Sequence, residues 1–148
     1  MADSDLISLY SGKLLELAAD IPLTGRLPAP EGTARKRSPI CGSTVTVDVV
    51  MRDGRIAEFA QDVRACALGQ ASASILGRVV IGRSQPEIEQ AKAALNAMLT
   101  GAEAPKAPFD QYEYLSPARD YRNRHASIML ALEATLEAVL DAEAKAKG

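Results

Sequence analysis

The dipeptide Asp53-Gly54 constrains the fold of this chain more than any other feature, because it joins two stretches with strand character. Valines alternate with polar residues over about residues 44–51, and a second strand is expected at 55–59. Asp-Gly readily supplies the two positive backbone φ angles of a type I′ hairpin turn. With a third short strand at 62–65, the sequence predicts an antiparallel meander.

Helical periodicity surrounds this meander. Apolar residues recur every three or four positions over residues 4–19, and again from 67 to about 82. A further helix is expected from Ser84, a capping residue followed closely by a proline, to about Leu99. Between the first helix and the strands, residues 24–39 are rich in Pro, Gly and Arg, which indicates an irregular lead-in.

The C-terminal third is expected to be helical after a Pro/Ala loop at 102–110. Ser116-Pro117 opens this region, and the tail 141–148 is predicted to be frayed. No internal repeat or domain linker is apparent. The order of elements predicts a single α+β domain over residues 1–148, with a small antiparallel three-stranded sheet and helices packed on one face.

Composition and charge exclude several classes of function. The 17 basic and 19 acidic residues give a formal charge of -2, which argues against a general nucleic-acid or anionic-membrane binder. The first residues are acidic, unlike a signal peptide, and no apolar run approaches the roughly 18 residues of a membrane span. The expected location is therefore the cytoplasm, where two isolated cysteines indicate burial, metal binding or chemistry.

Cys66 lies immediately before a predicted helix. Unpaired N–H groups and the helix dipole at that end favour an anion, and so a thiolate that is both nucleophile and metal ligand. The alternative is a buried, inert cysteine, because free cysteine is among the most often buried residue types. Position alone does not decide between the two.

Cys41 and His125 could complete a site with Cys66. Cys41 lies in a constrained Pro-Ile-Cys-Gly turn before the valine strand, and His125 lies near the start of the last helix. Two thiols and an imidazole suit zinc or iron–sulfur chemistry. The spacing is not that of a zinc finger, so such a site could form only in the folded chain. A lone histidine can instead be an ordinary hydrogen-bonding group.

These residues together resemble a known family, the U-type iron–sulfur cluster assembly scaffolds, which include the N-terminal domain of NifU and the IscU- and SufU-like proteins. The resemblance covers nearly the whole chain in the correct order. The matching segments are residues 9–15, 39–42, 53–56, 66–74 and 124–128.

The chain departs from the family pattern at two ligand positions. Ser43 stands where the family has an aspartate after Cys-Gly, and Ala126 stands where it has a third cysteine after the histidine. Leu115-Ser116-Pro117 is similar to the leucine-proline motif that many members present to a chaperone, but lies further from His125 than the family pattern places it.

The resemblance implies a SufE/NifU-like fold in which Cys41, Cys66 and His125 converge at one exposed end. It also implies a scaffold or carrier that accepts sulfur from a cysteine desulfurase and holds a transient iron–sulfur cluster, or zinc. Downstream partners would be iron–sulfur apoproteins or carriers. The alternatives are a zinc-activated persulfide-relay sulfurtransferase and a degenerate interaction module of the same fold.

Overall fold

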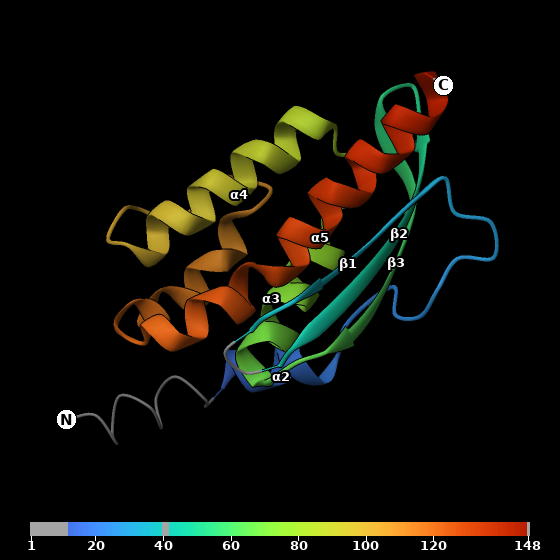
Figure 1. Ribbon diagram of the computed structural model, residues 1–148. Helices are drawn as coiled ribbons and strands as arrows, with labels where there is room; N and C mark the ends of the chain where they lie inside the picture. The colour runs from blue at the N-terminus through green and yellow to red at the C-terminus, as the bar shows by residue number, and fades with distance from the viewer. Residues whose placement is uncertain (1–11, 40–41, 148) are drawn as a thin grey trace.

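The computed structural model describes residues 12–39 and 42–147, which form an α+β fold with the helices on one side of an antiparallel sheet (Figure 1). This confirms the predicted fold class. The elements in chain order are α2 (Lys13–Ala19), β1 (Gly32–Arg37), β2 (Thr44–Arg52), β3 (Arg55–Arg64), α3 (Ala67–Gly77), α4 (Gln85–Leu99), the 3-10 helix η1 (Asp110–Asp120) and α5 (Arg122–Lys147).

The sheet has three strands in the order β1-β2-β3, and both pairings are antiparallel. Asp53 and Gly54 both have positive φ angles, 52° and 75°, which confirms the predicted β2–β3 turn. Two details of the predicted meander are wrong. The strands expected at 55–59 and 62–65 are one continuous strand, β3, and the expected lead-in at 24–39 contains β1.

The helix boundaries agree with the sequence pattern in α4 and differ from it in α3 and in the C-terminal region. Ser116 and Pro117, which were expected to open the last helical region, lie inside η1, and α5 begins at Arg122. α4 begins with the predicted cap, since Ser84 and Glu87 form a reciprocal capping box. α3 ends at Gly77, earlier than expected. The predicted frayed tail is wrong, because α5 continues to Lys147. Of the first predicted helix, residues 13–19 form α2, and the rest lies outside the described residues.

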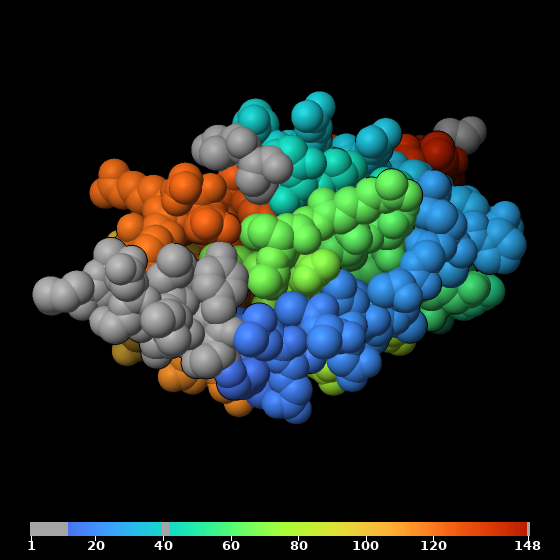
Figure 2. All heavy atoms as spheres, turned by 90° about the horizontal axis from the view of Figure 1, so that it is seen from below, coloured from blue at the N-terminus to red at the C-terminus, as the bar shows by residue number. Residues whose placement is uncertain are grey.

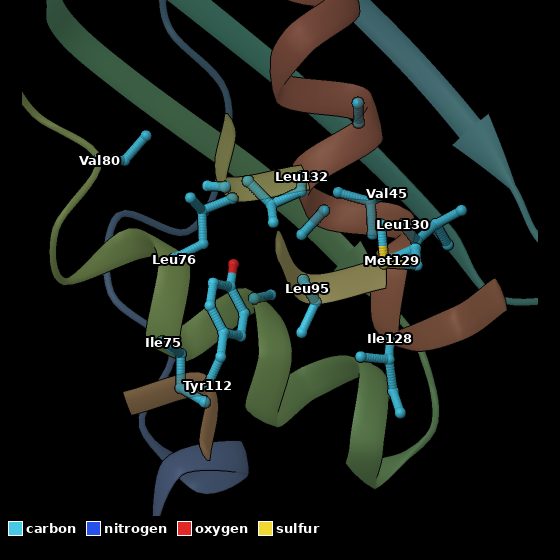
Figure 3. Close-up of a cluster of buried hydrophobic side chains, with 14 of the residues drawn as sticks. Val45, Ile75, Leu76, Val80, Leu95, Tyr112, Ile128, Met129, Leu130 and Leu132 are labelled. Atoms are coloured by element: carbon cyan, nitrogen blue, oxygen red, sulfur yellow. The ribbon is translucent and has the colours of Figure 1, made fainter. Parts of the chain in front are cut away.

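The core lies between the sheet and the helices, and α5 is its central element. This helix packs against β1 and β2 on one side and against α3 and α4 on the other. Its side chains Ile128, Leu130 and Leu132 meet Leu76 of α3 and Val45 of β2 in one apolar cluster (Figure 3).

The opposite face of the sheet is partly covered by the segment between α2 and β1. Asp48 on β2 is fully buried there, and it accepts hydrogen bonds from Arg26 (2.7 and 3.0 Å), the Leu27 backbone N–H and the Thr33 hydroxyl. Across the described ranges, no helix combines the length and apolar character needed to span a membrane.

Candidate functional site

Cys66 occupies the N-cap position of α3, as the sequence predicted. Its backbone is extended there (φ -67°, ψ 170°), and its side chain makes no capping hydrogen bond to the helix. The residue is half-buried and packs against the edge of the core. The thiol therefore lies at the start of a helix with part of its surface accessible, which suits a nucleophile or a ligand.

Two buried hydroxyl groups connect Cys66 to other elements. Cys66 Sγ lies 3.4 Å from the Oγ atom of Ser127 on α5. Ser127 Oγ in turn donates a hydrogen bond to Ser43 Oγ, at 3.1 Å, just before β2. In the view from below, the cyan start of β2, the green stretch leading into α3 and the orange start of α5 come together (Figure 2). Three distant parts of the chain thus meet at the thiol.

Gly69 makes this meeting sterically feasible. A Cβ atom at Gly69 would lie 2.7 Å from Ser127 Oγ and 2.8 Å from the Cβ atom of Ala65. Atoms do not approach that closely without a shift, so a side chain here would push α5 away from the start of α3. Glycine at this position therefore allows Ser127 to reach Cys66.

The segment that carries Cys41 begins and ends next to the same hydroxyl pair. The backbone N–H of Ser38 donates to the Ser43 carbonyl (2.8 Å), and the N–H of Gly42 donates to the Ser38 carbonyl (2.9 Å). Cys41 itself lies outside the described residues. Its predicted role as a ligand consequently stays a prediction, although the residues on either side are held near Ser127 through Ser43.

His125 lies in the first turn of α5, as expected from the sequence. Its Nε2 atom is 3.0 Å from the Ala118 carbonyl oxygen and 3.1 Å from that of Arg119, at the end of η1. Carbonyl oxygens only accept hydrogen bonds, so Nε2 carries a proton and Nδ1 is the nitrogen left for a ligand. A backbone carbonyl that orients a histidine in this way is typical of metal ligands.

His125 also lines a hollow of about 690 Å³, together with Leu99, Thr100, Arg119, Asp120 and Arg122. The guanidinium group of Arg119 donates hydrogen bonds to the carbonyls of Met98 and Ala102, at 2.9 and 3.1 Å. Arg119 thereby satisfies backbone acceptors at the end of α4, which is a structural role.

The predicted ligands Cys66 and His125 lie on either side of the same helical turn of α5, one beside Ser127 and the other beside η1. Within residues 12–39 and 42–147, no group of three His, Cys, Asp or Glu side chains is arranged to hold a metal ion. A site with three such ligands would therefore need Cys41. The convergence of Cys41, Cys66 and His125 stays a prediction.

Sequence reasoning did not identify Ser127 as a neighbour of the thiol. The contact joins residues 61 positions apart, and no local pattern reveals it. It also treated Ser43 only as a missing carboxylate, whereas the structure shows a buried hydroxyl that is part of the same hydrogen-bonded group. The Leu115-Ser116-Pro117 segment belongs to η1, and Leu115 is fully buried in the core.

Comparison with solved structures finds close likeness over almost the full chain. The crystal structure of the N-terminal part of a nitrogen-fixing NifU-like protein from Brucella abortus is 40% identical in sequence, with a TM-score of 0.91. The match covers 95% of this chain and 98% of that chain.

Two more distant structures share the fold. A hypothetical protein solved at 2.3 Å is 21% identical, with a TM-score of 0.79, over 95% of this chain and 99% of its own. A putative iron–sulfur cluster assembly scaffold for the SUF system from Fervidobacterium islandicum AW-1 is 18% identical, with a TM-score of 0.78, over 88% and 96%. No family model matches the chain. No curated protein matches it either.

Proposed function

Because this chain belongs to the family of NifU-like N-terminal domains, we propose that it is an iron–sulfur cluster assembly scaffold or carrier that works in the cytoplasm. It receives sulfur from a cysteine desulfurase, holds a cluster or metal ion transiently, and passes it to downstream apoproteins or carriers. The observation that carries the proposal is the 40% identity with a NifU-like protein over nearly all of both chains.

Cys41, Cys66 and His125 are the proposed ligands of this cargo. Cys66 contributes a half-buried sulfur at the start of α3, and His125 contributes Nδ1, since its other nitrogen faces backbone carbonyls. Two thiolates and one imidazole are a ligand set that suits iron–sulfur clusters and zinc alike. A site with few protein ligands at the molecular surface also suits a cargo that must be released.

Anaerobic reconstitution with iron and sulfide tests the proposal directly. We expect the purified protein to acquire the visible absorption of a cluster, and the variants C41S, C66S and H125A to lose most of it. Asn123→Ala, an exposed neighbour on the same turn of α5, is the matched control and should bind like the wild type. A wild-type protein that stays colourless would contradict the scaffold role.

A persulfide relay is the second candidate, and the half-buried thiol of Cys66 at the α3 N-terminus supports it. In this reaction the Cys66 thiolate attacks the outer sulfur of the donor's persulfide. The donor's S–S bond breaks, a new S–S bond forms on Cys66, and the donor leaves as a thiolate. Stoichiometric zinc in the purified protein, without uptake of iron, would favour this zinc-activated sulfurtransferase over the scaffold.

A further inference from the structure

Ser127 is a buried hydroxyl for which the proposed ligand set gives no role. The residue is 1% exposed, and its Oγ atom lies between Cys66 Sγ at 3.4 Å and Ser43 Oγ at 3.1 Å. Only a residue without a side chain at position 69 leaves room for this hydroxyl. The close α3–α5 contact at Gly69 thus places the Ser127 hydroxyl next to the Cys66 sulfur.

A count of protons shows what this hydroxyl can do when Cys66 binds cargo. A free thiol can donate to Ser127 Oγ, while Ser127 donates to Ser43. A ligated cysteine has lost its proton, so its sulfur can only accept a hydrogen bond. Ser127 has one proton, which can go to Ser43 Oγ or to Cys66 Sγ. A hydrogen bond to a charged acceptor is roughly twice as strong as a neutral one, which favours the sulfur.

We propose that Ser127 is a positioning residue, which donates a hydrogen bond to Cys66 Sγ when that sulfur is bound to a metal ion or cluster. The inference rests on the proposed function, because it concerns Cys66 as a ligand. The hydrogen bond fixes the direction of the sulfur and withdraws electron density from it. Hydrogen bonds of this kind to ligating sulfurs tune the electronic properties and the affinity of the bound metal.

Cobalt(II) alone is a suitable probe, because sulfur-to-cobalt charge transfer gives an absorption band whose energy depends on the sulfur lone pairs. We expect this band in the wild-type protein. In Ser127→Ala it should shift to longer wavelength, since a sulfur without the hydrogen bond gives up electron density more easily. Cobalt affinity should also fall, by about 10-fold or more, as is typical when a partner of a metal ligand is removed.

Ser72→Ala is the matched control. Ser72 is a buried hydroxyl at the same α3–α5 contact, but it donates to the Ile128 carbonyl at 2.6 Å instead of meeting the sulfur. This variant loses a comparable buried hydrogen bond and should keep the wild-type band. If S127A does not fold, Gly69→Ala gives a second test, because it displaces the Ser127 hydroxyl without deleting it and should shift the band in the same direction.

The outcomes separate the two proposals. A wild-type protein without any charge-transfer band would contradict metal binding at the cysteines, and so the proposed function and this inference together. A wild-type band that is unchanged in S127A, or one that shifts equally in S72A, would overturn the role of Ser127 and leave the proposed function intact.

Discussion

Asp48 is a buried carboxylate on the face of the sheet that the helices do not cover. Burial by itself would raise the pKa of this carboxyl group. The hydrogen bonds from Arg26, Thr33 and the Leu27 backbone, with the charge of Arg26, outweigh burial and hold the pKa below its usual value. Asp48 thus attaches the segment before β1 to the centre of β2.

This lowered pKa predicts a pH dependence of stability at acidic pH. The unfolded chain has the ordinary aspartate pKa, about 3.9, so Asp48 stabilises the fold fully above that pH. The contribution is lost as the pH falls through the lower pKa of the folded state. Asp48→Asn should destabilise the protein by about 1–3 kcal/mol at neutral pH. As the pH falls below about 4, the unfolding free energy of this variant should decrease less than that of the wild type.

Urea unfolding of both proteins between pH 7 and pH 2 measures this difference. Asp62→Asn is the matched control, because Asp62 lies on the neighbouring strand with an exposed side chain and one long ion pair, 3.7 Å from Arg64. The control should resemble the wild type across this range. Equal acid sensitivity of D48N and the wild type would show that Asp48 does not contribute as described.

At the candidate site, the sequence identified what depends on local position and missed what depends on tertiary contact. Cys66 at the start of α3 follows from the change to helical periodicity after it. His125 was expected near the start of the last helix, although α5 begins at Arg122 and not at Ser116-Pro117. The Ser127 contact follows from the way α5 crosses α3, with Gly69 at the crossing. A glycine in a helix does not by itself indicate which side chain packs against it.

Among the elements, β1 and the end of α5 were both mispredicted, and one contact explains both errors. β1 presents Gly32 and Ala34 toward the helices, so it lacks the alternating large apolar residues that identify a strand. The tail of α5 has few large apolar residues as well. The two are held together by close backbone packing and by a hydrogen bond from the Thr33 N–H to Asp141 (3.0 Å), 108 positions away.

Gly32→Ala tests this packing. A Cβ atom at Gly32 would meet the Ala138 carbonyl oxygen and would lie 2.6 Å from the Ala142 backbone nitrogen, and backbone atoms cannot rotate away. We expect a loss of about 1–3 kcal/mol in unfolding free energy, as for other overpacked sites. Arg35→Ala, an exposed change on the same strand, should cost less than about 0.5 kcal/mol. Urea unfolding compares the two, and equal stability would contradict the close packing.

For the molecule as a whole, the fold does not depend on the site. The apolar core extends through the sheet, α2, α3, α4, η1 and α5, whereas the described ligand candidates Cys66 and His125 are only partly buried. The metal-free protein should therefore be folded, unlike a zinc finger. Yet these ligands come from separate parts of the chain, so a bound metal ion links segments that would otherwise move apart on unfolding.

Zinc should therefore raise the melting temperature without being needed for folding. A ligand that binds only the folded state at 100 times its dissociation constant adds about 2.7 kcal/mol, which corresponds to roughly 5–10 °C for a domain of this size. Thermal unfolding with zinc or with a chelator measures the shift, and Cys66→Ala should abolish most of it. N123A should keep the full shift. A wild-type protein with the same melting temperature under both conditions would instead favour an interaction module that has the fold without the site.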